Sequence, residues 1–186
     1  TPGAMRNATK ADWRAMYSTP ASMGTRCHQL AAYIVHDSPF TMLCDAPTNY
    51  LNEQECVDFI TSLPVETDST FIASGELGKY IVTVRKKDVN WYVGGMTNWD
   101  RRDVELDFSF LRYTATLFVD GINADKQAED YRMEKRIVDR ESRMKLHLAS
   151  GGGFAMKLEL CPLRGRVTAV PEGKGIPSFY KKYIET

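Results

Sequence analysis

The amino-acid sequence predicts an α+β fold, in which a helix–strand–helix segment is followed by an antiparallel β-sandwich. Two observations support this prediction. Residues 25–63 show helical spacing of apolar side chains on both sides of a short apolar run, and residues 65–160 contain at least six short strand-like segments separated by turn residues. The composition, 43% hydrophobic and 26% charged, is typical of a globular protein.

Charge and hydropathy argue against two classes of partner. Twenty-four basic residues balance twenty-four acidic ones, so binding of nucleic acid through bulk electrostatics is not expected. No apolar run reaches the roughly 20 residues that span a bilayer, so no membrane partner is expected either. Thr1–Met5 does not begin with Met and shows no charged-then-apolar signal segment, which indicates a chain that continues upstream.

The first predicted helix lies within residues 25–37. Its apolar side chains recur at the spacing of a helix that is buried on one side, namely Cys27, Leu30, Ala31, Ile34 and Val35. Ser38 precedes Pro39, and a residue before proline disfavours the helical conformation. We therefore expect the helix to end before this pair.

A short strand is predicted at Phe40–Cys44, because a run that is apolar on both faces is typical of a buried parallel sheet covered by helices. A second helix follows at 53–63, with Asn52 as its N-cap and Glu55 as the capping-box acid. Its apolar face contains Cys56, Phe59, Ile60 and Leu63. One parallel strand has no ladder partner in this segment, so its partners are expected upstream or in another chain.

The strands of the predicted sandwich follow, and several alternate between apolar and polar residues. They are expected at 80–84, 91–96, 104–110, 114–119, 143–148 and 154–160, with a polar turn at 86–90. Strands of this length and number predict two antiparallel sheets packed face to face. Residues 161–186 are interrupted by proline and glycine, and either a short docking helix or a frayed tail fits them.

Sequence motifs of common enzymes are absent. The sequence contains no phosphate-binding glycine loop, no His-Glu-x-x-His motif and no nucleophile elbow. The four cysteines form no Cys-x-x-Cys pair, and Cys27 and Cys56 lie on apolar helical faces, where free thiols behave as small hydrophobic groups. Gly151–Gly153 stands between two strand patterns and is predicted to be a turn.

Two residues are candidates for substrate binding. Asp45 follows the apolar strand at its carboxyl end, where α/β sheets place their sites; alternatively it caps the amides of Thr48 or Asn49. His28 lies beside the apolar stripe of the first helix, either as a hydrogen-bonded structural histidine or as a pocket-lining residue.

The remaining polar and aromatic residues have simpler interpretations. His147 shares a strand face with Lys145 and is predicted to be solvated. Trp91, Tyr92 and Trp99 could stack on a sugar, but aromatic residues in hairpins more often belong to the core.

Six segments, in order, resemble the C-terminal part of glycoside hydrolase family 97, a bacterial family of α-glucosidases and α-galactosidases. They are 1–5, 24–31, 45–50, 91–99, 120–125 and 151–155, with the sequences TPGAM, GTRCHQLA, DAPTNY, WYVGGMTNW, DGINAD and GGGFA. Each motif alone is weak evidence, and their common order makes the resemblance specific. It extends from residue 1 to about residue 160.

The resemblance implies a domain organisation. Family members have an N-terminal β-sandwich, a central (β/α)8 barrel and a C-terminal β domain involved in oligomerisation. Residues 1–64 would then be a fragment of the barrel, comprising its last strand, Phe40–Cys44, and two helices. Residues 65–160 would be the C-terminal antiparallel β-sandwich, and residues 161–186 would be a tail without an inherited role.

The resemblance also implies a function. We expect the C-terminal portion of a glycoside hydrolase that acts on α-linked oligosaccharides, secreted or periplasmic, with its two catalytic carboxyl groups upstream. No catalytic or metal-binding residue maps onto this chain, and the calcium ion implied for the full-length enzyme would be held by upstream glutamates. The expected partners are the upstream barrel and further copies of the chain. The alternative is a non-catalytic module for carbohydrate binding or self-association.

Overall fold

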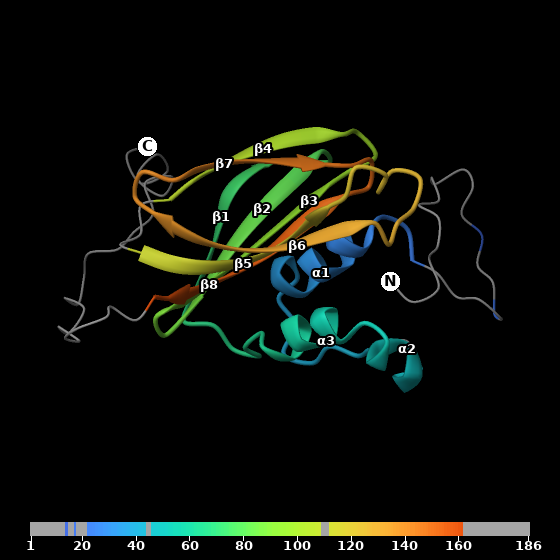
Figure 1. The fold of residues 1–186 in the computed structure, drawn as a ribbon, viewed down its shortest axis with the longest axis horizontal. Coiled ribbons are helices and arrows are strands. Elements are labelled where there is room, and N and C mark those ends of the chain that lie inside the picture. The colour runs from blue at the N-terminus through green and yellow to red at the C-terminus, as the bar shows by residue number, and fades with distance from the viewer. Residues whose placement is uncertain (1–13, 15–16, 18–21, 44–45, 109–111, 162–186) are drawn as a thin grey trace.

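The computed structural model describes residues 14, 17, 22–43, 46–108 and 112–161. Their elements form three layers, with a large sheet between a two-stranded sheet and a group of helices (Figure 1). The helices are α1 (Arg26–Val35), α2 (Pro47–Leu51) and α3 (Gln54–Thr61). In the same range, no helix is long and apolar enough to cross a membrane.

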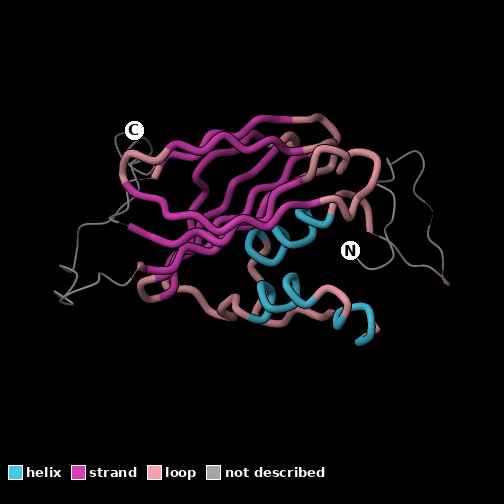
Figure 2. The backbone as a smooth tube through the Cα atoms, viewed as in Figure 1, coloured by secondary structure: helices cyan, strands magenta, loops and turns pink. Residues whose placement is uncertain are grey.

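The large sheet has six antiparallel strands in the order β1-β2-β3-β8-β5-β6, and the small sheet pairs β4 with β7. Figure 2 shows the strands of both sheets on one side and the helices on the other. The strands of the large sheet are β1 (Ser69–Glu76), β2 (Tyr80–Lys87), β3 (Asn90–Thr97), β5 (Arg112–Asp120), β6 (Tyr131–Asp139) and β8 (Gly153–Leu160). The small sheet consists of β4 (Arg102–Asp107) and β7 (Arg143–Leu148). The chain thus contains the antiparallel β-sandwich that the alternating patterns predict.

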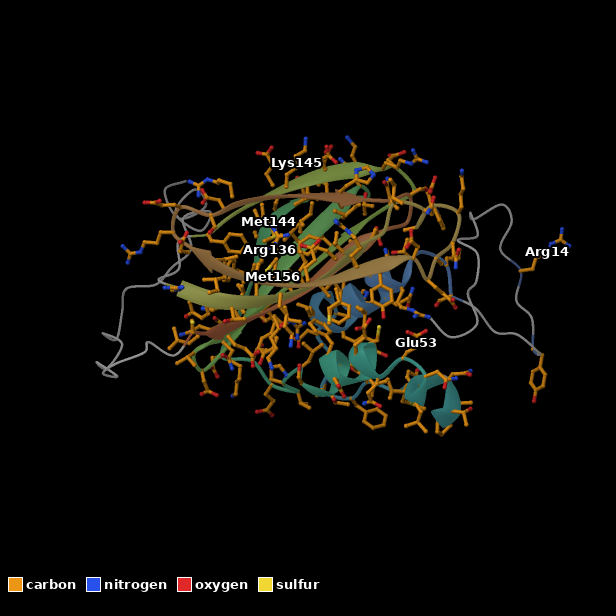
Figure 3. The ribbon with its side chains drawn as sticks, in the orientation of Figure 1. Arg14, Glu53, Arg136, Met144, Lys145 and Met156 are labelled. Atoms are coloured by element: carbon orange, nitrogen blue, oxygen red, sulfur yellow. The ribbon has the colours of Figure 1, made fainter. Side chains whose placement is uncertain are left out.

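The main core lies between the two sheets. Alternate residues of β4 and β7 point inward, because successive side chains of a strand face opposite sides. They meet apolar residues of the large sheet, and the buried set includes Val84, Trp91, Val104, Leu106, Leu117, Met144, Leu146, Phe154, Met156 and Leu158. Figure 3 shows Met144 and Met156 within this layer and Lys145 pointing away from it.

The outer face of the small sheet carries opposite charges in register. The acidic strand β4 places Asp103, Glu105 and Asp107 opposite the basic residues His147, Lys145 and Arg143 of β7. Cross-strand pairs of opposite charge favour an antiparallel ladder in this register. Asp103 contacts both His147 and Lys145, at 2.8 Å and 2.9 Å. The prediction that His147 is solvated is confirmed, because its side chain is mostly exposed.

Helices α1 and α3 cover the opposite face of the large sheet and form a second core with it. This core contains Cys27, Leu30 and Ile34 of α1, Cys56 and Phe59 of α3, and Tyr92, Phe118 and Ala155 of the sheet. The rings of Phe59 and Phe118 lie 5.0 Å apart between centroids. The apolar stripes of both helices are therefore buried against the sandwich.

A glycine allows α1 to approach the sheet closely. A Cβ atom on Gly94 would lie 2.9 Å from the Cβ of Ile34 and 3.0 Å from the carbonyl oxygen of Ala31. Real Cβ atoms essentially never come closer than 3.0 Å to another heavy atom, so the contact with Ile34 alone would force a shift. Packing against α1 therefore requires a glycine at position 94, although this residue lies within a strand and not in a turn.

The predicted strand at Phe40–Cys44 is not formed over the residues that the structure describes. Phe40, Thr41, Met42 and Leu43 have no strand conformation, and the side chain of Phe40 is 78% exposed. Cys44 lies outside the described residues. A parallel strand needs ladder partners on its edges, and the described residues supply none to this segment. The barrel fragment is therefore not confirmed, and the helices expected to cover that strand cover the sandwich instead.

Other boundaries differ in ways that follow from local chemistry. The turn between β2 and β3 is limited to Asp88 and Val89, because the lysines predicted to lie in the turn continue the strand. Two strands, β1 and β6, were not predicted from the sequence, because serine, glycine and charge obscure their alternation. The predicted capping box is wrong: Asn52 follows α2, and the side chain of Glu55 instead accepts a hydrogen bond from Tyr131.

Candidate functional site

His28, a predicted substrate-binding residue, lies in the first turn of α1 against the loop between β7 and β8. Its Nδ1 atom is 3.2 Å from the carbonyl oxygen of Gly152, and its side chain is partly buried. Burial lowers the pKa of this imidazole below its usual value, so the neutral form dominates near neutral pH. This is the hydrogen-bonded structural arrangement, and the role of His28 in substrate binding stays a prediction.

Asp45, the other predicted substrate-binding residue, lies outside the described residues, as does the end of the apolar run before it. Both roles predicted for Asp45, in substrate binding or as a cap for the amides of Thr48 or Asn49, therefore stay predictions. The amide of Asn49 already donates to the carbonyl oxygen of Ala46 at 3.0 Å, in the first turn of α2.

The described residues contain a polar cluster that sequence reasoning missed, centred on Asp120 at the end of β5. This carboxylate is 5% exposed and accepts three hydrogen bonds. The hydroxyl of Thr25 donates to one oxygen at 2.7 Å, and the amides of Ala149 and Gly153 donate to the other at 2.9 Å each. One side chain thus connects the start of α1, the end of β5 and the loop between β7 and β8.

Thr25 completes the connection as the N-cap of α1. Its hydroxyl oxygen accepts a hydrogen bond from the amide of His28, and its own amide donates to the carbonyl oxygen of Gly151 at 3.0 Å. N-cap residues usually satisfy only the first turn of a helix. Here the hydroxyl of the cap also donates a hydrogen bond to a buried carboxylate and fixes α1 to the sandwich.

Burial controls the protonation of this cluster. Desolvation raises the pKa of Asp120 to about 6, although its three hydrogen bonds oppose the rise. Desolvation also raises the pKa of the Cys27 thiol, so the thiol next to the carboxylate stays protonated and unreactive. The structural role that the sequence predicts for Cys27 and Cys56 fits their burial, and both thiols are free.

Arg26 forms a second connection between the helices and the sandwich. Its guanidinium group is buried and pairs with Glu53 at 2.7 Å and with Glu129 at 3.4 Å. It also lies over the ring of Tyr131 at the start of β6, 5.6 Å from the ring centroid. Figure 3 shows Glu53 in the helical segment below the sheet.

The aromatic residues offer little surface for stacking on a sugar. Trp91 and Tyr92 are both buried, on opposite faces of β3, in the two cores of the molecule. Trp99 is half-buried, and its ring packs directly against Gly151 in the turn between β7 and β8. Gly151 has a φ of 62°, which is left-handed backbone that favours glycine, and the predicted turn at 151–153 is confirmed in its first two residues.

The arrangement fixes α1 and the segment before α3 to the sandwich. Asp120 is buried and fully engaged in hydrogen bonds. In the described parts of the chain, no three His, Cys, Asp or Glu side chains gather as metal ligands.

The chain is similar in sequence and in fold to known proteins. A retaining α-galactosidase of Bacteroides thetaiotaomicron is 50% identical over 162 residues, which cover 86% of this chain and 24% of that protein. A family 97 glycoside hydrolase from Pseudoalteromonas sp. strain K8, solved with panose, matches 73% of this chain and 22% of its own, at 32% identity and a TM-score of 0.69. A β-arabinopyranosidase shares the fold at 22% identity and a TM-score of 0.61.

These matches locate the chain within a family. The chain spans about a quarter of the length of its curated relative. The family model described as glycosyl-hydrolase 97 C-terminal, oligomerisation, matches residues 66–159, which contain the eight described strands apart from Leu160. The chain therefore belongs to the glycosyl-hydrolase 97 C-terminal family.

Proposed function

We propose that this chain is the C-terminal portion of a longer retaining α-glycosidase that hydrolyses the α-galactosidic bonds of oligosaccharides. The 50% identity to a retaining α-galactosidase over most of the chain carries this proposal. The catalytic carboxyl groups lie upstream in the longer protein, where one protonates the leaving oxygen and the other attacks the sugar. The calcium ion of such an enzyme would also be held there.

The substrate could also be an α-glucoside. The Pseudoalteromonas enzyme was solved with panose and with acarbose, but its identity to this chain is only 31–32%. The higher identity to the α-galactosidase favours the galactoside. We further propose that the enzyme is periplasmic or secreted, which fractionation of the source cells would test.

In the longer protein, Phe40–Cys44 would be the last strand of a (β/α)8 barrel. The exposure of Phe40, Met42 and Leu43 supports this proposal, since three large apolar side chains in one short segment are costly to leave in water. The upstream barrel would supply the ladder partners that the described residues lack. Asp45, at the carboxyl end of this strand, would then stand at the face where barrels place their sites.

Hydrolysis of aryl α-galactoside and aryl α-glucoside tests the proposal. The longer protein is expected to hydrolyse the α-galactoside faster, and the 186-residue chain is expected to show no turnover above buffer. Turnover by the isolated chain would contradict the upstream placement of the carboxyl groups. A longer protein that cleaves neither substrate would overturn the proposed activity.

The second candidate function is non-catalytic self-association or carbohydrate binding. The oligomerisation description of the matched family favours self-association, whereas the burial of Trp91 and Tyr92 removes the best stacking surface for a sugar. Sedimentation and sugar titration of the chain distinguish the two. We expect oligomers and no sugar affinity.

A further inference from the structure

We propose that the outer edge of β6, which pairs with no other described strand, is a self-complementary surface. On it, a second copy of the chain adds its own β6 as an antiparallel strand centred on Lys135. This inference rests on the self-association proposed above and names the surface that carries it. It would extend the six-stranded sheet across a two-fold axis into the sheet of the second copy.

The two edges of the large sheet differ in regularity. β1 pairs with β2, but the register shifts between Ile72 and Ser74, and such bulges commonly make an edge unsuitable for further pairing. β6 pairs with β5 over nine consecutive residues without a shift, and no described strand pairs with its other edge. The edges of the small sheet are six residues long. β6 is therefore the longest regular edge among the described strands.

The side chains of β6 are unusually accessible for a strand of the sandwich. Six of its nine residues are exposed, including the apolar side chains of Met133 and Ile137, which are 40% and 53% exposed. Met133 lies opposite Phe118 and Ile137 opposite Thr114, so both point to the face that carries the helices. The helices therefore leave Met133 and Ile137 partly uncovered on this face.

Both ends of β6 are held in place, so the edge is organised before a partner arrives. At its start, Tyr131 donates a hydrogen bond to Glu55 and packs its ring on Phe118. At its end, the carboxylate of Asp139 accepts hydrogen bonds from the hydroxyl of Ser142 at 2.8 Å and the amide of Glu141 at 3.1 Å.

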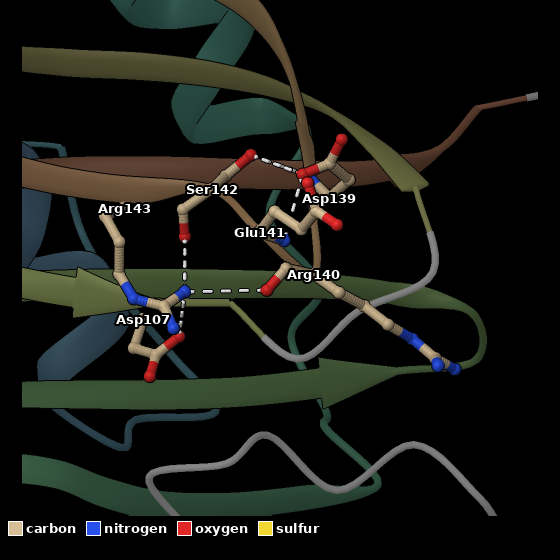
Figure 4. A network of polar contacts seen from close by, with 6 residues as sticks. All are labelled: Asp107, Asp139, Arg140, Glu141, Ser142 and Arg143. Atoms are coloured by element: carbon tan, nitrogen blue, oxygen red, sulfur yellow. Dashed lines mark hydrogen bonds and ion pairs between the residues drawn. The ribbon is translucent and has the colours of Figure 1, made fainter.

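Figure 4 shows this turn and its link to the small sheet. Arg143, the first residue of β7, forms an ion pair with Asp107 at the end of β4, at 2.6 Å. Its guanidinium group also donates to the carbonyl oxygens of Arg140 and Ser142. A fixed strand loses little conformational freedom when a partner binds, which favours association.

The register follows from symmetry and charge. Lys135 is the midpoint of Tyr131–Asp139, so full overlap of two antiparallel copies places Lys135 on the two-fold axis. Met133 then lies opposite Ile137 of the partner subunit, and Glu134 lies opposite Arg136 of the partner subunit. Each copy makes both contacts twice. A shift of one residue is excluded, because it would place opposing side chains on different faces of the sheet.

Shifted registers are less favourable. A centre at Glu134 would oppose two carboxylates and would set Arg132 against Arg136 of the partner subunit. A centre at Met133 keeps opposite charges together but pairs only residues 131–135. Within one copy, Glu134 already forms ion pairs with Arg132 and Arg136, so the edge presents alternating charges that a second copy can match. The full register brings the two Lys135 side chains together on the axis. Their ammonium groups repel each other, and this repulsion is reduced because the long side chains can extend into water.

A charge exchange tests the surface. Sedimentation velocity of the 186-residue chain across the micromolar range is expected to show dimers. Glu134→Arg and Arg136→Glu should each weaken homodimers by roughly tenfold, because both contacts become repulsive. An equimolar mixture of the two variants should recover dimers, because every 134–136 contact becomes attractive again. Lys145→Glu on β7 is the control and should leave the association unchanged.

Disulfide trapping tests the register. Lys135→Cys places two thiols on the two-fold axis and should form a covalent dimer under mild oxidation, whereas Glu134→Cys should not, because its copies would be displaced from each other. The wild-type chain controls for the native cysteines. Trapping of Glu134→Cys instead, or wild-type dimers that the charge variants do not affect, would overturn the β6 surface while leaving self-association intact. A wild-type chain that stays monomeric would overturn both, and neither result affects the proposed glycosidase activity.

Discussion

At the scale of single residues, Asp120 is the centre of the structure that joins the helices to the sandwich. A buried carboxylate normally costs free energy, and this one is stabilised by three donors, one at the start of α1 and two in the connection from β7 to β8. The sequence offers only a weak sign of this role, an acidic residue between an apolar strand and a glycine. The donors that define the role are up to 95 residues away.

We expect Asp120→Asn to destabilise the chain by about 1–3 kcal/mol at neutral pH. The side-chain NH2 group of asparagine is itself a donor, so at least one of the present donors to Asp120 would be left buried without an acceptor. Chemical denaturation measures the change. Glu105→Gln makes the same acid-to-amide change on the exposed face of β4 and should alter stability by less than about 0.5 kcal/mol. Equal effects of the two variants would contradict the role of Asp120.

The contribution of Asp120 to the stability of the wild-type chain is expected to fall as pH rises from about 4 to about 6. The pKa of Asp120 in the folded protein, about 6, is above its ordinary value of 3.8, so folding favours the protonated form. The stability that Asp120 contributes is fully present below the pKa of the unfolded chain. It is lost as pH rises through the pKa of the folded protein, with a total of roughly 3 kcal/mol. Denaturation at a series of pH values measures it. Asp120→Asn should lack this decrease, and an identical pH profile for the variant would disprove the assignment.

Two buried arginines should respond oppositely to replacement by methionine. Arg85 is 5% exposed, pairs only through one nitrogen with Asp37 at 3.2 Å, and leaves Nε and Nη2 without a hydrogen-bond partner among the described residues. Arg85→Met is expected to preserve or raise stability, by up to about 2 kcal/mol, because buried, poorly paired charge is removed. Arg26→Met should destabilise, since it separates Glu53 and Glu129 from their cation. Thermal melts distinguish the two, and a large loss at Arg85 would contradict this interpretation.

At the scale of elements, the contact between α1 and β3 depends on the absence of a side chain at Gly94. The helix lies so close to the strand that Ile34 and the carbonyl group of Ala31 occupy the space of a Cβ atom. Interiors packed to this density do not accept added volume without displacement of a neighbour. The close position of α1 on the sheet therefore depends on Gly94.

We expect Gly94→Val to cost about 1–3 kcal/mol or more and to loosen α1. Hydrogen exchange should show faster exchange of the amides of Arg26–Val35, while β4 and β7 of the small sheet keep their protection. Gly78→Asn is the control, because Gly78 has a φ of 75°, which asparagine tolerates, and a Cβ atom at this position would have no neighbour within 4 Å. Unchanged exchange in α1 of the valine variant would contradict the packing argument.

At the scale of the whole molecule, the sandwich and the helical segment share a core and are not independent. The helices cover Tyr92, Phe118 and Ala155 on the outer face of the large sheet. A boundary near residue 64 separates two sequence patterns, but the buried contacts of Thr25, Arg26 and Phe59 cross it.

Deletion of residues 1–64 is therefore expected to expose the outer face of the sheet. The remaining chain should melt at a lower temperature and bind a hydrophobic dye more strongly than the 186-residue chain, because several large apolar side chains enter water. Calorimetry and dye fluorescence measure both effects. A shortened chain that melts at the same temperature without dye binding would show that the two parts are independent.

Local patterns in the sequence are sufficient to predict several elements. The spacing of Cys27, Leu30 and Ile34 predicts α1, Pro39 follows its end, and the alternation in β4 and β7 predicts strands with one face buried. Such patterns depend on neighbours within a few residues, so they can be read along the chain. The family resemblance, which rests on short motifs in a fixed order, is likewise a property of the sequence.

Which surfaces meet becomes evident only in three dimensions. The sequence cannot show that the apolar stripes of α1 and α3 cover the sandwich, that Phe40–Leu43 lacks a ladder among the described residues, or that Asp120 accepts a hydrogen bond from Thr25. Of the two predicted site residues, His28 lies against the turn at Gly152, and Asp45 lies outside the described residues. Strand pairing and buried hydrogen bonds join residues far apart in the chain, and their free energy depends on a three-dimensional arrangement that local spacing does not encode.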